Sequence, residues 1–441
     1  MDDLKIYSAI KSYEESKPVR LHMPGHKGKN VSGLSFYSGY DVTELPALDI
    51  ENVLSSAEED IAKIMGAKKC HILTDGSSAG VLSMIYGIKD VGRQLIIFRS
   101  SHKSVYNGLT LAGIEPIIIE DDTENVLSEV KKAVSENPET IGALLTYPDY
   151  YGRVFDIEKV SEFLKSKGKL LLIDGAHGSH FKFTGYPVYA GEFADAWVDG
   201  VHKTNVTFNQ GALLLINNVF LERRLLSAAD IFSTTSPSYI IAASVEYGVK
   251  FLNDNKDGKL EKFCAAKQRT DDEIKALGYV LSHTDDPMKT VIDFYSSGYD
   301  SGKANAFLEK NGVFAEMNDG KNTVFMFSVS NSVKDLKRFI LALKLLKQAE
   351  GVSATPLADG KRIKCERVLP YLSAVNAEYE YTPIEESADR ICAENFGVLP
   401  PCSPIVVAGE KINEEAINEV KSGKYVFGIK DGKVKTVKIR G

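Results

Sequence analysis

The stretch KLLLIDGAHGSH, residues 169–180, decides the fold of this chain. It opens with a largely apolar run that has the length of one buried strand, and a polar segment rich in glycine and histidine begins directly afterwards at Asp174. Similar apolar runs, most of them followed by a polar cluster, occur on both sides of it. These further runs are CHIL (70–73), QLIIF (94–98), EPIII (115–119), IGALLT (141–146), DAWV (195–198) and GALLLI (211–216).

Helical spacing separates several of these runs, most clearly over residues 126–135 and 157–167. Short apolar runs that alternate with helices are typical of buried parallel strands joined by crossover helices. We therefore predict an α/β fold with a mainly parallel sheet and helices on both of its faces. All seven runs are expected to be parallel strands of this sheet.

Ligands of such folds bind at the carboxyl ends of the strands, so the segments that follow the runs form the candidate site. Several of these segments are polar and contain glycine or histidine. They are TDGSSAG (74–80), RSSHKS (99–104), YPDYYG (147–152), DGAHGSH (174–180) and DGVHKT (199–204). We expect them to lie together at one edge of the sheet.

The pattern changes after this series of runs. A strand-like segment at 288–295, a helix near 302–311, a hairpin and a helix at 333–347 predict a compact α+β unit. The segment near 350–362 has the composition of a linker. We predict four parts, namely an N-terminal arm (1–44), a large domain that carries the candidate site (45–285), a small α+β domain (286–350) and a C-terminal domain (351–441).

The composition excludes several classes of protein. The 441 residues are 44% hydrophobic, which is enough for a sizeable core, and the formal net charge of −7 gives no basic footprint for nucleic acid. No apolar stretch predicts a membrane span, and the polar N-terminal segment lacks the apolar core of a signal peptide. The five cysteines are scattered without a C-x-x-C pair, which favours reduced thiols in a cytoplasmic protein.

Asp174 and Lys203 each follow a predicted strand directly or after a few residues. Alone, the aspartate would be an ordinary helix cap and the lysine a solvated surface group. Together, at neighbouring strand ends, they match the needs of pyridoxal 5′-phosphate (PLP), which uses a lysine amine to hold its aldehyde and an acid to keep its pyridine nitrogen protonated. TDGSSAG opens a helix whose N-terminus favours a phosphate, and His102 could stack on the ring.

A metal site is the alternative interpretation of DGAHGSH, because Asp174, His177 and His180 are all metal-ligating residue types. The segment is too short and too rich in glycine to be the helical zinc motif, so we predict no metal. G-x-G-x-x-G and G-x-x-x-x-G-K-[ST] are both missing from the sequence, which leaves dinucleotide and P-loop sites without support.

The ordered set of motifs resembles the PLP-dependent ornithine/lysine/arginine decarboxylases of the aspartate-aminotransferase fold (fold type I), in their short form without an N-terminal regulatory wing. The resemblance runs nearly the whole length, including a C-terminal segment at 372–412. The motifs that carry it are LHMPGHKGKN (21–30), YDVTELPALD (40–49), ILTDGSSAG (72–80), RSSHKSV (99–105), YPDYYG, DGAHGSHF (174–181), GVHKT (200–204) and STTSPSY (233–239).

The resemblance implies a role for each residue that matches a family motif. Lys203 would bind the cofactor covalently with His202 beside it, and Asp174 would pair with the pyridine nitrogen. His102 and Ala176 would contact the two faces of the ring, and His177 would also contact the cofactor. The remaining implied contacts are with Gly76, Ser77 and Ser78, which would cradle the phosphate, and with Thr235 and Ser236, which would approach the site from a neighbouring subunit.

The implied reaction is the decarboxylation of arginine, lysine or ornithine to an amine that serves polyamine biosynthesis. The implied assembly is a homodimer with active sites at the subunit interface. The distal cation of such a substrate needs an acidic partner, for which Asp41, Glu44 and Asp49 are the candidates. Their alternative role is that of turn and cap residues.

The chain departs from the family pattern at four single positions and in the C-terminal segment LPPCSP (399–404), which stands where the family has Y-P-P-G-I-P. Asp75 stands where the family usually has Asn, Gly175 where it has Glu, Gly200 where it has Ser, and Asp149 lies in the segment that is usually T-S-P-T-Y-Y-G. The anion of Asp75 near the phosphate would be offset by Lys103 or Lys27. These departures keep two alternatives open, namely another PLP reaction such as transamination or elimination, and a catalytically silent PLP-binding homologue.

Overall fold

The predicted apolar runs form one seven-stranded sheet. The structure is a computed structural model that describes residues 4–18, 20, 24, 26–27, 29, 37–43, 49–120, 123–353, 363–398, 403–422 and 426–438. The strands of the large sheet are β1 (Lys69–Leu73), β2 (Gln94–Phe98), β3 (Glu115–Ile119), β4 (Gly142–Thr146), β5 (Leu170–Gly175), β6 (Ala196–Asp199) and β7 (Ala212–Ile216). Their order across the sheet is β1-β7-β6-β5-β4-β2-β3.

The mainly parallel sheet is confirmed, with one exception. Strands β2 to β6 pair in parallel, whereas β7 runs antiparallel to both β1 and β6, so the expectation of a parallel strand for GALLLI was wrong. The cause is the short connection from β6 to β7, which holds only α8 (Val201–Thr204) and a turn. A parallel crossover needs a longer connection, so the chain reverses direction.

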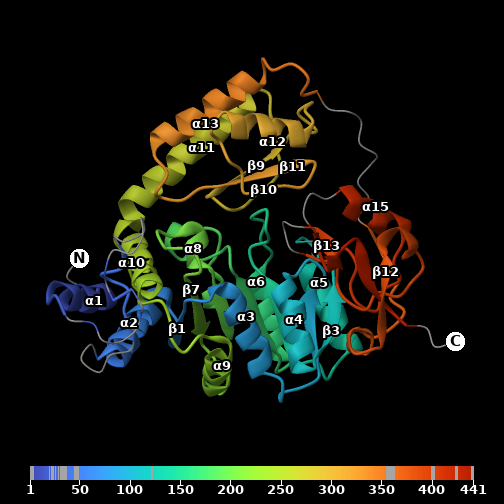
Figure 1. Ribbon diagram of the computed structural model, residues 1–441, viewed down its shortest axis with the longest axis horizontal. Coiled ribbons are helices and arrows are strands. Elements are labelled where there is room, and N and C mark those ends of the chain that lie inside the picture. Colours follow the sequence, from blue (N-terminus) through green and yellow to red (C-terminus); the bar gives the residue numbers. More distant parts are fainter. Residues whose placement is uncertain are drawn as a thin grey trace.

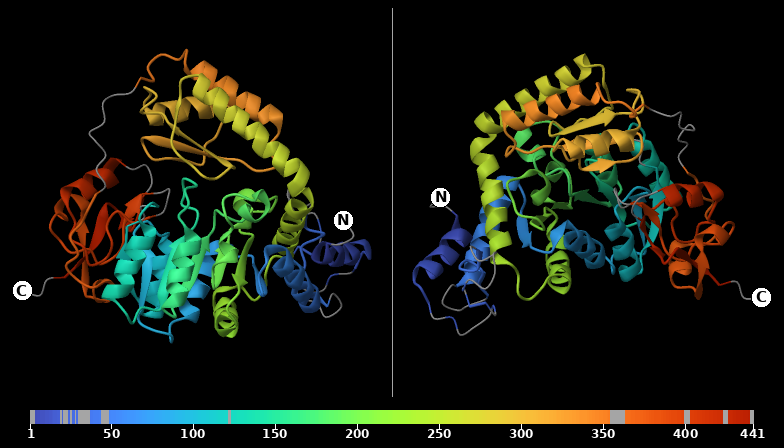
Figure 2. Two further views of the ribbon diagram at one scale, coloured as in Figure 1. Left: turned by 180° about the vertical axis from the view of Figure 1, so that it is seen from behind. Right: turned by 45° about the horizontal axis from the view of Figure 1, so that its top comes forward.

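Helices cover both faces of this sheet, as predicted (Figures 1 and 2). Their buried side chains and those of the strands form two separate cores, one on each face. The first face carries α3 (Gly76–Gly87), α4 (Lys103–Ala112), α9 (Val219–Phe232) and α14 (Tyr371–Val375). The second carries α1 (Lys5–Glu15), α2 (Ile50–Met65), α5 (Val126–Glu136), α6 (Ile157–Ser166), α7 (Phe181–Thr184) and α10 (Tyr239–Asn255).

A smaller antiparallel sheet lies above the carboxyl edge of the large one in Figure 1. Its strands, in the spatial order β10-β11-β9-β8, are β8 (Val280–Leu281), β9 (Lys289–Asp293), β10 (Met317–Asn318) and β11 (Asn322–Met326). The predicted hairpin is the β10–β11 pair. Helices α11 (Glu261–Ala276), α12 (Ser301–Lys310) and α13 (Val333–Leu346) pack on one face, and the other face contacts Tyr150 and Tyr151 of the large domain.

The two sheets are linked by a long bent helix. Helix α10 continues through a π-helical segment, Lys256–Leu260, into α11, and Asp257 in that segment has non-helical dihedral angles (φ −84°, ψ 15°). Figures 1 and 2 show this helix rising from the large domain to the small one. Strand β8 pairs with β9, so the small sheet begins before residue 286. The four domain boundaries stay predictions.

The C-terminal part packs beside β3 and α4. It contains β12 (Tyr379–Pro383), β13 (Gly397–Val398), α15 (Glu414–Ser422), β14 (Val426–Phe427), β15 (Ile429–Lys430) and β16 (Lys433–Val437). The Glu115 carboxylate of β3 accepts hydrogen bonds from the first two backbone N–H groups of α14, at 2.6 and 2.9 Å. In the described part of the chain, no helix has both the length and the apolar character that crossing a bilayer requires.

Candidate active site

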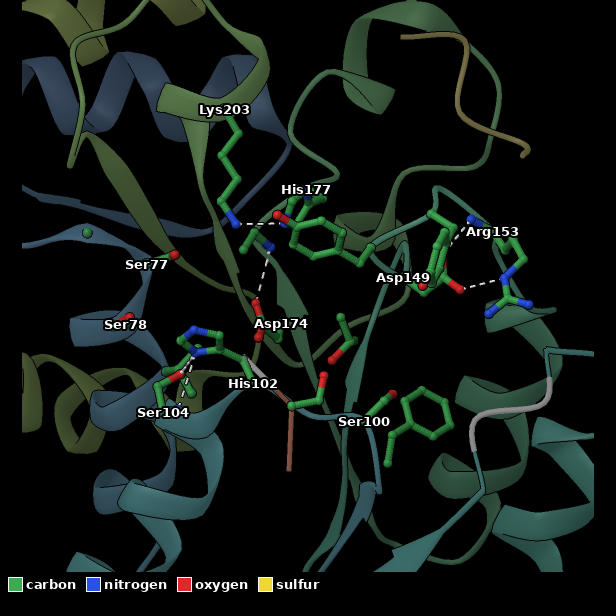
Figure 3. A pocket seen from close by; sticks show the side chains of 18 of the residues that line it. Ser77, Ser78, Ser100, His102, Ser104, Asp149, Arg153, Asp174, His177 and Lys203 are labelled. Atoms are coloured by element: carbon green, nitrogen blue, oxygen red, sulfur yellow. Dashed lines mark hydrogen bonds and ion pairs between the residues drawn. The ribbon is translucent and has the colours of Figure 1, made fainter. Parts of the chain in front are cut away.

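A cavity of about 380 Å³ lies at the carboxyl edge of the large sheet, below the small one (Figure 3). Its wall brings together residues from all five polar segments that were singled out in the sequence. The predicted site residues in this wall are Gly76, Ser77, Ser78, His102, Asp174, Ala176, His177, His202 and Lys203. The expectation that the strand ends share one site therefore describes the geometry correctly.

Lys203 lies in α8, the single helical turn that follows β6, and its Nζ is 2.8 Å from Nε2 of His177. His177 is buried, and burial, reinforced by the positive charge of Lys203, holds its pKa well below the ordinary value. A neutral imidazole can accept a hydrogen bond from the lysine ammonium at Nε2 and carry its proton on Nδ1. The lysine amine is thus held in a defined position inside the cavity.

Asp174 is the fifth residue of β5 and is only 3% exposed. One of its carboxylate oxygens accepts a hydrogen bond from the backbone N–H of Ala176 at 3.2 Å. A buried carboxylate is stable when a cation pairs with it, and the protonated pyridine nitrogen of PLP is such a cation. Its position at a strand end, facing the cavity in Figure 3, fits that role.

His102 caps the N-terminus of α4. Its Nδ1 accepts a hydrogen bond from the backbone N–H of Ser104 at 3.2 Å and lies 2.8 Å from the Ser104 hydroxyl oxygen. Burial lowers the pKa of His102, so the ring is neutral at neutral pH. A neutral ring fixed by its cap contacts is suited to stacking on a flat cofactor.

The predicted phosphate cradle corresponds to the first turn of α3. Gly76 has φ +81°, a conformation that glycine adopts without strain, and it starts the helix with Ser77 and Ser78 facing the cavity. Deeper in the helix, a Cβ on Gly80 would lie 2.7 Å from Leu73 and from Val198, so the missing side chain lets α3 lie close against the sheet. A helix N-terminus with exposed N–H groups favours a phosphate.

Asp75 is directed away from this cradle. Its carboxylate accepts a hydrogen bond from the backbone N–H of Thr234 at 3.4 Å in an exposed turn. The expected offset of its charge by Lys103 or Lys27 stays a prediction.

The residues present fit PLP. Lys203 and Asp174 are groups of the kind that would hold the cofactor, and the N-terminus of α3 would supply the anion site. In addition, two buried side-chain polar atoms of residues in the cavity wall, His177 Nδ1 and Thr146 Oγ1, have no hydrogen-bond partner among the described residues. Buried polar atoms of this kind are normally satisfied, so both are available to a polar ligand.

A family model described as Orn/Lys/Arg decarboxylase, major domain, matches residues 5–281. The chain belongs to this family. It is an amino-acid decarboxylase by membership, and pyridoxal phosphate is its cofactor. The resemblance inferred from the motifs, the fold class and the cofactor are thereby confirmed.

Relatives of similar length are named arginine decarboxylase. The one from Bacillus subtilis (strain 168) is 26% identical and covers 94% of this chain and 92% of its own length. The one from Halalkalibacterium halodurans is 25% identical over 98% and 97%. Among solved structures, E. coli constitutive lysine decarboxylase superposes with a TM-score of 0.80 at 18% identity and covers 99% of this chain and 82% of that one. The last comparison shows that the fold is shared.

The glycines that depart from the family pattern have a structural reason in this decarboxylase. A Cβ on Gly200 would lie 2.4 Å from the carbonyl oxygen of Ala176, and one on Gly175 would lie 2.9 Å from both the Asp199 carboxylate and the Val198 carbonyl oxygen. The ends of β5 and β6 therefore approach too closely for the serine and glutamate of the family.

His202, the residue before Lys203, also lines the cavity. Its Nδ1 is 2.8 Å from the carbonyl oxygen of Gly211, so the proton lies on Nδ1 and Nε2 is an acceptor. Burial lowers the pKa of His202 as well. His180, by contrast, turns away from the cavity, with Nε2 2.7 Å from the buried Asp286. Among the described residues, no group of three or more potential metal ligands gathers.

Several predicted residues do not line the cavity of their own chain. Asp41 lies 3.0 Å from His26 Nε2, and Asp49 accepts a hydrogen bond from Asn52. Glu44 lies outside the described residues. Thr235 and Ser236 occupy the exposed turn before α10, where their predicted contact with a neighbouring subunit stays a prediction.

The sequence analysis did not single out part of the cavity wall. Tyr150 packs on His177 with ring centroids 4.8 Å apart, and its hydroxyl donates to Glu316 of the small domain at 2.8 Å. Arg153, Phe155 and Ser403 also line the cavity. YPDYYG was recognised as a polar segment, so Tyr150 carried a signal. Ser403 carried a signal only through the resemblance, because it lies in the segment 399–404 that stands where the family has Y-P-P-G-I-P.

Proposed function

We propose that this family member decarboxylates a basic amino acid, arginine, lysine or ornithine, and releases CO2 and the corresponding amine. The arginine decarboxylases among its relatives support the substrate class. The observation that carries the proposal is that Lys203, Asp174, His102 and the first turn of α3 surround one cavity.

The cofactor would be held by these same groups. Lys203 Nζ would bind it covalently, the carboxylate of Asp174 would pair with its ring nitrogen, and Ser77 and Ser78 would receive its phosphate. When bound, PLP supplies an electron sink for the pair of electrons released as the bond from Cα to the carboxylate breaks. His102 and Ala176 would fix the plane of the ring from its two faces.

The chain's own residues then manage protons and water. Lys203 Nζ can pass a proton to His177 Nε2 or take one back across their 2.8 Å contact. The proton that replaces the carboxylate on the substrate would come from Lys203 Nζ or from His202 Nε2, since both residues line the cavity. The aromatic rings of Tyr150 and Phe155 in the cavity wall would help to exclude water from the reacting groups.

We also propose a cytoplasmic homodimer in which Thr235 and Ser236 approach the partner's cavity, and a role of the product amine in polyamine biosynthesis. The exposure of both residues on a turn tied to Asp75 supports the contact. Analytical ultracentrifugation tests the assembly, and a monomer at working concentration would contradict it.

Lys203→Ala tests the assignment of the cofactor lysine. The wild-type protein is expected to show a visible absorbance band that borohydride bleaches, and to release CO2 from at least one basic amino acid. The variant is expected to lose the lysine-linked band and at least about 1,000-fold in activity, because a covalent catalyst is removed. Lys334→Ala, which alters an exposed lysine of α13, is the control. A band without CO2 from any basic amino acid would favour another PLP reaction or a silent homologue.

A further inference from the structure

The cavity wall contains two carboxylates among the described residues, Asp174 and Asp149. Asp174 is buried at the end of β5, where the cofactor nitrogen is expected. The carboxylates first considered for the substrate, Asp41 and Asp49, pair with His26 and Asn52 outside this wall. A distal cation in the same cavity would therefore meet Asp149.

Asp149 is held firmly by the turn that follows β4. Its backbone N–H donates to the carbonyl oxygen of Arg153 at 3.0 Å, and the N–H of Gly152 donates to the Asp149 carbonyl oxygen at 3.0 Å. Gly152, with φ +87°, packs so closely on the small domain that a Cβ would lie 2.5 Å from the hydroxyl of Thr284. Lys289 Nζ donates to the carbonyl oxygen of Tyr150 at 3.1 Å. The carboxylate is thus presented from a rigid position.

The Asp149 carboxylate already binds a guanidinium group. One oxygen accepts a hydrogen bond from the backbone N–H of Arg153 at 2.8 Å, and the other accepts from its Nε at 2.6 Å. Each oxygen retains a further lone pair. The side chain of Asp149 is 20% exposed and that of Arg153 is 39% exposed, so the arginine can move into solvent while the aspartate stays in the wall. Tyr151 lies beside the pair, 5.5 Å from the Arg153 guanidinium carbon.

We propose that Asp149 is the specificity-determining acceptor of the substrate's distal cation, and that Arg153 occupies this acceptor until the substrate replaces it. A carboxylate that accepts a guanidinium next to an aromatic ring combines the two interactions that recognise such a cation. The inference rests on the proposed function and deepens it by naming the residue that recognises the guanidinium or ammonium group at the far end of the substrate.

Binding of product amines to the PLP-loaded protein tests this inference without turnover. Agmatine carries the distal guanidinium, whereas pentylamine lacks any distal cation, and the affinity of both can be measured by calorimetry. Wild-type protein is expected to bind agmatine more tightly. Asp149→Asn is expected to lower the affinity for agmatine by about tenfold to one hundredfold, the range for a lost charge-assisted hydrogen bond. The affinity for pentylamine is expected to stay unchanged.

Arg153→Gln provides the second arm. Removal of the competing guanidinium is expected to leave agmatine binding unchanged or to tighten it. Asp156→Asn, which breaks an exposed aspartate–lysine pair with Lys159 outside the cavity wall, is the matched control and is expected to change neither ligand. The visible cofactor band of every variant reports whether the site is intact.

Three results would overturn the assignment of Asp149. They are equal binding of agmatine and pentylamine by the wild type, an unchanged preference in Asp149→Asn, and a loss of agmatine binding in Arg153→Gln as large as that in Asp149→Asn. If agmatine binding depends on Asp149 but no basic amino acid releases CO2, the inference stands and the proposed reaction fails.

Discussion

Asp199 is a fully buried carboxyl group next to Gly175 and Gly200, the two glycines at the ends of β5 and β6. Its Oδ2 accepts a hydrogen bond from the hydroxyl of Tyr189 at 2.5 Å, and that hydroxyl oxygen accepts one from the indole N–H of Trp197 at 2.8 Å. Its Oδ1 has no hydrogen-bond partner among the described residues. Burial raises the pKa of Asp199 to about 7 from an ordinary value of 3.8. Below about pH 7, burial therefore makes the protonated acid of this residue more stable than the carboxylate.

This raised pKa makes stability depend on pH. The folded chain holds the proton between pH 3.8 and about 7, whereas the unfolded chain has released it, so the stabilisation is complete below the unfolded pKa and is lost as the pH rises through the folded one. Asp199→Asn removes the titration and is expected to give a shallower fall in the free energy of unfolding over this range. Urea denaturation at several pH values measures it, with the exposed Asp230→Asn as the control. If the free energy of unfolding fell with pH equally in wild type and in Asp199→Asn, the raised pKa would not belong to Asp199.

The inner residues of the site were accessible to sequence reasoning because each follows a strand. Asp174, His102 and Lys203 are placed by local pattern alone, since the ends of parallel strands share one edge. Asp149 was noticed only as a member of the polar segment YPDYYG and as a departure, because its pairing with Arg153 and its place in the wall depend on a turn that the small domain holds. Contacts between domains leave no local pattern in the chain.

At the scale of elements, α3 is the helix whose position defines the anion site. It packs against β6 and β1 through Gly80 on one side and against Leu225 of α9 through Gly87 on the other, where a Cβ would lie 2.6 Å from that leucine. Side chains at these glycines would push the helix away from the sheet. The first turn would then move relative to Lys203.

Gly80→Ala is therefore expected to weaken PLP binding and to lower the free energy of unfolding by about 1–3 kcal/mol, the range for overpacking a core. Gly302→Ala in α12 is the matched control, because its Cβ would have only ordinary contacts, the nearest being Asp300 at 3.5 Å. Fluorescence titration with PLP and thermal denaturation measure the two effects. If Gly80→Ala were destabilised but bound PLP with unchanged affinity, the packing of α3 at this glycine would not determine PLP binding.

The periodicity of apolar residues predicted whether most segments are helices or strands, but it did not predict the direction of β7. An apolar run has the same composition whether its strand is parallel or antiparallel, so only the length of the connection from β6 carried that information. The connection that holds α8 is too short for a parallel crossover, and its length was not used in the prediction.

On the scale of the whole molecule, an ion pair between Arg99 and the buried Glu410 joins the C-terminal part to the segment that carries His102. Arg99, which follows β2, donates from both terminal nitrogens to the carboxylate of Glu410 at 2.6 and 2.7 Å, and the carbonyl oxygen of Arg99 accepts from Tyr106 at 2.9 Å. Burial acts against the charge of Arg99, but Glu410 outweighs it and raises the pKa of the guanidinium. Because His102 lies three residues later, this ion pair helps to fix the stacking residue.

Glu410→Gln is expected to destabilise the protein by about 3–5 kcal/mol, because it leaves Arg99 as a buried charge without its counter-charge. The melting temperature should fall, and PLP affinity should fall with it as the segment before His102 loosens. Glu380→Gln, in an exposed pair with Arg390, is the control. A melting temperature within one degree of the wild type, roughly the effect of a surface pair, would show that the C-terminal part does not depend on this contact.

The turn at Asp149 is also anchored by residues far along the chain. Lys289 donates to its carbonyl oxygens, and Glu316 and Asp319 accept the hydroxyls of Tyr150 and Tyr151. In evolutionary terms, the part of the cavity wall at residues 149–151 therefore depends on two separate stretches of sequence, namely the turn itself and the small-domain residues that hold it. Substitutions in the small-domain strands can retune which amines are accepted while Lys203 and Asp174 remain untouched, so new preferences can arise in this fold without passing through an inactive ancestor.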